Sequence, residues 1–134
     1  MTITNIVRGA LDNHLTGMVG VPTIAYQNVK FEPVTGVAYV KATLIPTRRR
    51  LVTLGFNQQQ KYQGLYRILA CTPESEGSGA GYTLADALLT RFEAASEISF
   101  GGKIISINFA EVGTSFQDSP FYCTPVDIGW YIYN

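Results

Sequence analysis

Only two stretches of this chain carry helical periodicity, and this limits the folds that the chain can adopt. From Ile3 to Leu15 the apolar residues recur at spacings of three and four, with polar residues between them. A second such stretch begins at Thr83, whose hydroxyl suits a helix N-cap with an acid three residues later, and is expected to end near Ser96. Two helices are too few for repeated βαβ units, so the pattern predicts an α+β fold.

The other apolar stretches are β-prone and are separated by turn signals. The expected strands cover residues 23–28, 37–45, 51–56, 64–71, 103–112 and 121–133. Pro46 is expected to end the second strand, because proline cannot donate to a strand ladder. The prediction is two helices packed on one face of a mostly antiparallel or mixed β-sheet with a protruding β-hairpin, as a single domain over residues 1–134.

The charge balance disfavours some classes of partner. Lys plus Arg and Asp plus Glu number ten each, so the strong positive field of a dedicated DNA-binding protein is missing. Charged residues make up only 15% of the chain, against about 25% in average domains, which favours contacts between apolar surface and other protein. No apolar run approaches the length of a membrane span, so we expect a soluble protein without a membrane partner.

The residues that could perform chemistry are few. His14 is the only histidine, and at the end of the first helical stretch we interpret it as a helix C-terminal residue with a structural role. The acids show no spacing typical of a paired-carboxylate site. We therefore predict that the protein is not an enzyme and has no catalytic, cofactor-binding or metal site. Cys71 and Cys123 are interpreted as reduced, buried thiols, although their spacing leaves a disulfide open.

Three consecutive arginines, Arg48, Arg49 and Arg50, are the sharpest local feature and the predicted partner-binding residues. On the connection of a hairpin they are either a solvated turn or a contact with an acidic protein surface or with passing DNA, because adjacent guanidinium groups repel one another unless matched by negative charge. Of the two contacts we favour the protein. Aromatic side chains that could stack on bases leave a single-stranded nucleic-acid-binding module as an alternative. They are Tyr62, Tyr66, Phe121, Tyr122, Trp130, Tyr131 and Tyr133.

A series of short motifs resembles a family of tail terminator-like proteins of long-tailed phages and prophages. In the first half these are Phe31-Glu32-Pro33, Ala38-Tyr39-Val40-Lys41-Ala42, Leu44-Ile45-Pro46, Gly64-Leu65-Tyr66-Arg67-Ile68 and Pro73. In the second half these are Gly77, Gly79, Leu84-Ala85-Asp86, Phe92, Gly101-Gly102, Ile105-Ser106-Ile107, Tyr122, Pro125-Val126 and Ile128. Each motif is unspecific alone, and their common order carries the resemblance. The three arginines are not part of it.

The resemblance implies a virion assembly protein that forms a hexameric ring. Such a ring caps the tail tube, ends tube polymerisation and forms the interface to the head connector. The implied partners are further copies of the chain, the major tail tube protein and the head-tail connector proteins, while DNA passes through the ring without being specifically bound. The implied location is the head-proximal end of the tail, after assembly in the host cytoplasm. Another head-tail connector or completion protein is the alternative within virion assembly.

Overall fold

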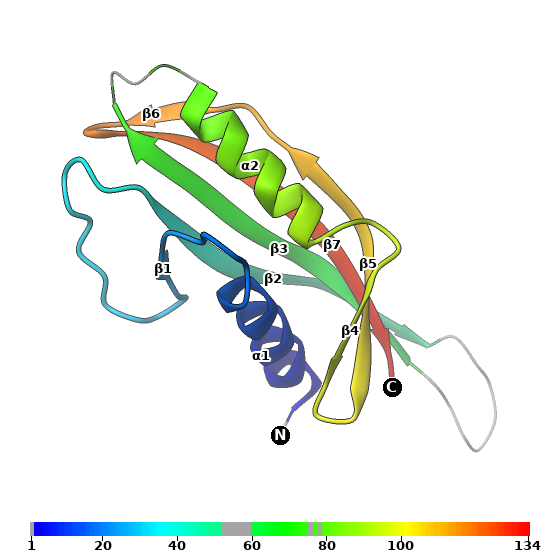
Figure 1. Cartoon of the computed structure of the whole chain (residues 1–134). Coiled ribbons are helices and arrows are strands. Elements are labelled where there is room, and N and C mark those ends of the chain that lie inside the picture. The colour runs from blue at the N-terminus through cyan, green and yellow to red at the C-terminus, as the bar shows by residue number, and fades with distance from the viewer. Residues whose placement is uncertain (1, 52–59, 75–76, 78) are drawn as a thin grey trace.

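The computed structural model describes residues 2–51, 60–74, 77 and 79–134, in which two helices and seven strands are found (Figure 1). The elements are α1 (Ile3–Thr16), β1 (Thr23–Ala25), β2 (Tyr39–Leu51), β3 (Gln60–Pro73), α2 (Gly79–Arg91), β4 (Glu97–Phe100), β5 (Lys103–Val112), β6 (Phe116–Asp118) and β7 (Phe121–Tyr133).

All the strands belong to one mixed sheet. Its strand order is β1-β2-β3-β7-β5-β4, with β6 paired to β7 outside this path. The short β1 runs parallel to β2, and every other pair is antiparallel. Figure 1 shows the long strands β2, β3 and β7 running side by side along the molecule. The predicted α+β class with a mixed sheet is confirmed.

The main core joins alternate residues of the central strands to side chains of both helices. On the strands it contains Val40, Ala42, Leu44, Tyr66, Ile68, Ala70, Val126, Ile128, Trp130 and Ile132. Both helices contribute apolar residues three or four positions apart, among them Leu11 and Leu15 of α1 and Ala85 and Leu88 of α2. Side chains on a strand alternate between faces, so these strand residues lie on one face, which we call the core face. The opposite face is called the open face.

The first helix follows the predicted pattern. Thr2 caps α1 by accepting a hydrogen bond from the backbone N–H of Asn5, and the stripe that includes Val7 and Leu11 is buried. Helical spacing therefore placed these side chains correctly in the core.

The prediction that Pro46 ends a strand is wrong. The strand β2 continues to Leu51, so Arg48, Arg49 and Arg50 lie on a strand and not on a connection. Proline is tolerated because β1 pairs only with residues 39–41, which leaves Pro46 on the edge of the sheet, and the register with β3 shifts at this point. The connection of the predicted hairpin is thus part of β2, and the expected strand 51–56 lies outside the described residues, apart from Leu51.

The second helix begins and ends earlier than predicted. It starts at Gly79, within the expected glycine-rich connector, and ends at Arg91. The early start brings Gly81 into the core, where a Cβ would lie 3.0 Å from the hydroxyl oxygen of Thr124. At the other end Ala95 adopts a left-handed backbone conformation with φ of 68°, which a continuing helix does not allow.

The strands β4 and β6 were not predicted. Gly101 and Gly102 both have positive φ and form a two-residue turn, which pairs the four residues of β4 with the start of β5 as a hairpin. The segment 113–120 was expected to be a loop, but its residues 116–118 form β6 against β7. Strands of three or four residues are too short to show a period in the sequence.

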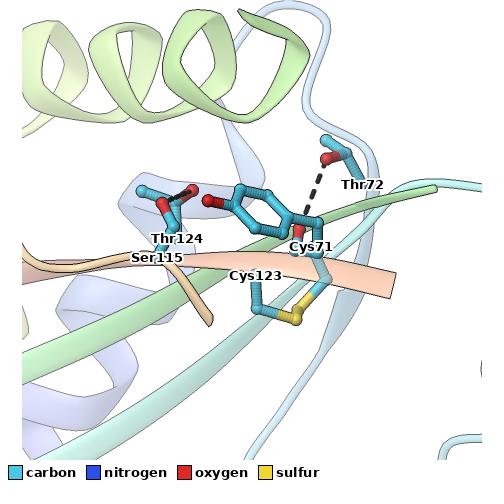
Figure 2. The surroundings of a disulfide bond; sticks show 6 residues. Cys71, Thr72, Ser115, Cys123 and Thr124 are labelled. Carbon is cyan, nitrogen blue, oxygen red and sulfur yellow. Dashed lines mark hydrogen bonds between the residues drawn. A yellow bond between two sulfur atoms is a disulfide. The ribbon is translucent and has the colours of Figure 1, made fainter. Parts of the chain in front are cut away.

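Cys71 and Cys123 form a disulfide, so their interpretation as reduced thiols is wrong. The two residues are register partners on the adjacent strands β3 and β7, with their Cα atoms 4.1 Å apart. Figure 2 shows the bond between the two strands, beside the hydrogen-bonded hydroxyls of Ser115 and Thr124. The sequence could not reveal this pair, because 52 positions separate the cysteines and only the strand order brings them together.

We expect Leu88→Ala and Phe92→Ala to lower the free energy of unfolding by roughly 2–5 kcal/mol each, because both side chains are fully buried in the main core. Chemical denaturation measures the loss. The control Val19→Ala, at a residue that is 97% exposed, should change stability by less than about 0.5 kcal/mol. Losses below about 1 kcal/mol at both buried sites would contradict the described packing of α2.

Removing the disulfide with the double substitution Cys71→Ser and Cys123→Ser should lower the free energy of unfolding by about 2–4 kcal/mol, because the bond closes a long loop in the unfolded chain. Reductant should destabilise the unmodified protein and leave the double variant unchanged. Two titratable thiols in the unreduced, unfolded protein would contradict the bond.

Candidate interaction surfaces

The three predicted partner-binding residues form one exposed strip at the end of β2. Arg48, Arg49 and Arg50 are all exposed, and none forms a salt bridge with an acid in the described part of the chain. The guanidinium of Arg49 lies 6.0 Å from the ring centroid of Tyr62 on the neighbouring strand. We call these three residues the basic edge, because β2 has no strand partner on its other side at this point among the described residues.

The register shift between Pro46 and Arg48 decides which way the arginines point. After the shift Arg49 pairs with Tyr62, whose ring packs against the main core. Because side chains alternate along a strand, Arg49 lies on the core face and Arg48 and Arg50 lie on the open face. The basic edge therefore presents positive charge to both sides of the sheet.

Further polar and aromatic side chains extend the positive surface on the open face. Lys61 pairs with both Arg50 and Tyr133 in the strand register. Its ammonium nitrogen lies 4.7 Å from the ring centroid of Tyr131 and 5.9 Å from that of Tyr133, distances typical of cation–π contacts. This end of the sheet therefore combines positive charge with flat apolar rings.

A partly exposed apolar row crosses the middle of the open face. Ile45, Leu65, Gly129 and Phe109 are successive register partners on β2, β3, β7 and β5. The ring of Phe109 lies where a Cβ of residue 129 would be, so a larger residue there would displace the ring. The three large side chains are half-buried. They belong neither to the main core nor to the smaller buried cluster around Tyr39 and the disulfide. The row is therefore a candidate for contact with another protein.

A bidentate ion pair lies beside this row. Arg67 donates from Nε to Oδ1 of Asp127 at 2.8 Å and from Nη2 to Oδ2 at 3.3 Å, across β3 and β7. The hydrogen bonds to Asp127 raise the pKa of Arg67 above its ordinary value. This arginine is thus already matched by a carboxylate, unlike those of the basic edge.

A pocket of about 330 Å³ lies between the N-terminus of α1 and the basic edge. Its lining includes Thr4, Arg48, Arg49 and Trp130. The indole Nε1 of Trp130 is buried and has no acceptor among the described residues, and the first turn of α1 contains no acid. A helix N-terminus beside the guanidinium of Arg49, the arginine on the core face, suits a carboxylate or another small anion.

A second concave surface is mainly apolar. A groove of about 470 Å³ is lined by Met18, Val19 and Pro22 after α1 and by Leu84 and Ala87 of α2. Val19 is 97% exposed there. The groove shares no lining residue with the pocket beside the basic edge and has the opposite chemical character, so the subunit carries at least two different candidate surfaces.

His14 joins the C-terminal ends of the two helices. Its Nε2 lies 2.8 Å from the carbonyl oxygen of Arg91, and Arg91 Nε donates to the carbonyl oxygen of His14 at 2.9 Å. Each side chain thus satisfies a backbone carbonyl that the end of the other helix leaves unpaired. The ring of His14 also packs edge-on against Phe92. This supports the structural interpretation of the residue.

Sequence reasoning found the basic edge but missed the other surfaces. The apolar row and the pocket depend on which residues are register partners, and this information is absent from a single sequence. The alternation of Leu65 with the buried Tyr66 on β3 carries part of the signal, but it does not say which strands lie on either side.

No helix in the described part of the chain is long and apolar enough to span a membrane. Within the same residues, no three His, Cys, Asp or Glu side chains gather as metal ligands would.

Comparisons with known proteins identify the fold and the family of this chain. One solved protein structure is similar over 98% of this chain and 96% of its own length, with a TM-score of 0.74 and 19% sequence identity. At this identity the likeness shows a shared α+β fold alone. No curated protein matches the sequence.

The family is shown by a different comparison. The sequence profile of the phage tail terminator protein family matches residues 3–130, nearly the whole chain. The chain belongs to the phage tail terminator protein family and is a structural component of the phage tail. The predicted resemblance is confirmed.

We expect the stability of the protein to fall as the pH drops below about 6.5, the ordinary pKa of histidine. Burial lowers the pKa of His14, and the charge of Arg91 acts in the same direction, so the folded protein binds the proton less readily than the unfolded chain. The contribution of neutral His14 to the free energy of unfolding is therefore complete above pH 6.5. It is lost as the pH falls toward the pKa of His14 in the folded protein.

Denaturation of the unmodified protein and of His14→Gln between pH 7.5 and 5 measures this effect. The substitution should flatten the pH dependence in this window, because the carboxylates titrate mainly below it. An equally steep fall in His14→Gln would assign the effect to another group.

Proposed function

We propose that the protein assembles as a hexameric ring that caps the tail tube, ends tube polymerisation and forms the interface to the head connector. The observation that carries this proposal is the family match over residues 3–130. The proposed partners are other copies of the chain, the major tail tube protein and the head-tail connector proteins. The proposed position is the head-proximal end of the tail, after assembly in the host cytoplasm.

The surfaces of the subunit support a ring. A cyclic assembly of identical subunits needs two different complementary patches on each subunit, because each contact joins one patch to the other. The basic edge, the apolar row of the open face and the apolar groove provide patches of different chemistry. A patch that is not used between subunits remains for contact with the tube or the connector.

The proposed mechanism is occupancy of the tube end. A ring that fits the last ring of the tube removes the surface on which the next tube subunit would add, so no covalent step is required. We therefore propose a role that is not enzymatic. The use of His14 in the contact between the helices supports this proposal.

Two alternatives remain. The first is another connector or completion protein, which would use the same surfaces for different neighbours. The second is a single-stranded nucleic-acid-binding module, favoured by Arg48, Arg50 and Lys61 lying on one face with Tyr131 and Tyr133. DNA passing through the proposed ring needs no such binding. A channel wall that bound the DNA tightly would slow its passage.

Substituting Arg48, Arg49 and Arg50 by Ser should leave the fold intact, because the three side chains are exposed. It should weaken capping, because it removes the unmatched positive charge that we expect to contact a partner. We expect overlong tails in an assembly reaction with tail tube protein, and an unchanged unfolding midpoint. The control Lys30→Ser, at an exposed base outside the sheet, should give tails of normal length. Normal tails from the triple variant would show that the basic edge is only solvated.

Binding to DNA separates the nucleic-acid alternative from the cap. A surface that binds the phosphates of single-stranded DNA loses affinity with salt, at a logarithmic slope of roughly 0.7 per neutralised phosphate. We expect no DNA binding at physiological salt. Tight binding that falls steeply with salt and is lost in the arginine-to-serine variant would favour the alternative.

A further inference from the structure

Two exposed groups of residues with opposite charge lie on opposite sides of the strand order. The strands β2 and β3 contain no Asp or Glu and include the basic edge and Lys61. At the opposite end of the strand order, Glu93 precedes β4, Glu97 begins it and Glu111 lies on β5. All three acids are exposed, and none forms a salt bridge with a described residue. We call these three residues the acidic edge.

Both charged segments lie where the sheet lacks a strand partner. On one side β1 covers β2 only at residues 39–41, and the side chain of Gln27 accepts from the backbone N–H of Leu44. On the other side β4 covers β5 at residues 103–106, and the backbone of Ala95 and Ser96 bonds to Ile107. Beyond these points no described strand pairs with the outer side of β2 or of β5. Unpaired strand edges can accept a strand of another chain.

We propose that the basic edge of one subunit binds the acidic edge of a second copy of this chain, and that this pairing is the subunit contact of the assembly. The inference rests on the ring proposed above and specifies which two surfaces close it. Arg48, Arg49 and Arg50 then face Glu93, Glu97 and Glu111 of the next subunit.

Charge complementarity favours a second copy as the occupant and also fixes the mode of contact. Arginines and a proline on a sheet edge normally prevent pairing with other edges. Here they exclude a second basic edge, because like charges brought together cost several kcal/mol, but they admit an acidic one. Two identical edges cannot meet, so the contact is head-to-tail. Head-to-tail contacts produce rings when the rotation closes.

The pocket beside the basic edge provides a receptor for a carboxylate. Arg48 and Arg49 line it together with the N-terminus of α1. A glutamate of the next subunit would give the first turn of α1 the negative charge that this turn does not contain.

A charge-swap experiment tests the pairing. One variant carries Arg48→Glu, Arg49→Glu and Arg50→Glu, and the other carries Glu93→Arg, Glu97→Arg and Glu111→Arg. Sedimentation velocity and electron microscopy of each variant alone should show a self-association at least about 100-fold weaker than that of the unmodified chain. An equimolar mixture should recover rings, because every contact in an alternating ring is complementary again.

Matched controls separate edge pairing from general charge effects. The variant Glu32→Arg, Asp86→Arg and Asp118→Arg changes the net charge by the same amount at exposed acids outside the acidic edge and should assemble normally. Unfolding midpoints of all variants should stay close to that of the unmodified protein, since every substituted residue is exposed.

A cross-linking measurement identifies the contact directly. In Arg49→Lys the new amine should form a carbodiimide cross-link to an acid of the acidic edge of another subunit, which mass spectrometry of the linked peptides would show. Links from residue 49 only to acids outside the acidic edge would overturn the pairing.

The outcomes distinguish the pairing from the proposed ring. Rings from both reversed variants alone would overturn the pairing and leave the cap intact. If each reversed variant alone fails to assemble and their mixture fails as well, the pairing is also overturned. The arginines would then be assigned to contacts with the tube or with DNA. An unmodified chain that stays monomeric, even with tail tubes present, would overturn both proposals.

Discussion

The antiparallel ladder of β3 between β2 and β7 is the constraint on which the rest of the structure depends. Its register places Ile68 between Ala42 and Val126 on the core face, and it brings Cys71 opposite Cys123. The helices then cover apolar side chains that the ladder has already aligned. The same ladder ends with Arg50, Lys61 and Tyr133 side by side, so the core and the charged surface follow from one register.

Sequence patterns were reliable where one element alone determines burial. Helical spacing identified the buried stripe of α1, and alternation identified β5 with Ile105 and Ile107 inside. The same alternation expected Phe109 on that face, which is wrong, because the register with β7 shifts after Ile107 and turns Phe109 to the open face. The patterns failed where a neighbouring strand decides the outcome. Pro46 did not end β2, because that position lies on an edge, and the disulfide joins strands whose adjacency no local pattern contains. The candidate site was found in part, since the arginine run was visible but its carboxylate pocket was not.

Separated charge and partly exposed apolar surface are two properties of the same subunit. A neutral chain with few charged residues does not repel its copies at long range, while unmatched arginines and glutamates at opposite ends of the strand order orient them at contact. The apolar row formed by Ile45, Leu65 and Phe109 remains for further protein partners. Such a division would suit the proposed contacts with other copies of the chain, with the tail tube and with the head connector.

The central claim is that the chain works as a closed ring on the end of the tail tube. Electron microscopy of the purified protein mixed with preformed tail tubes tests it most directly. The account predicts an additional ring with six-fold symmetry at one end of each tube, and no further tube growth from that end. Tubes with two bare ends that continue to grow in the presence of excess folded protein would contradict it.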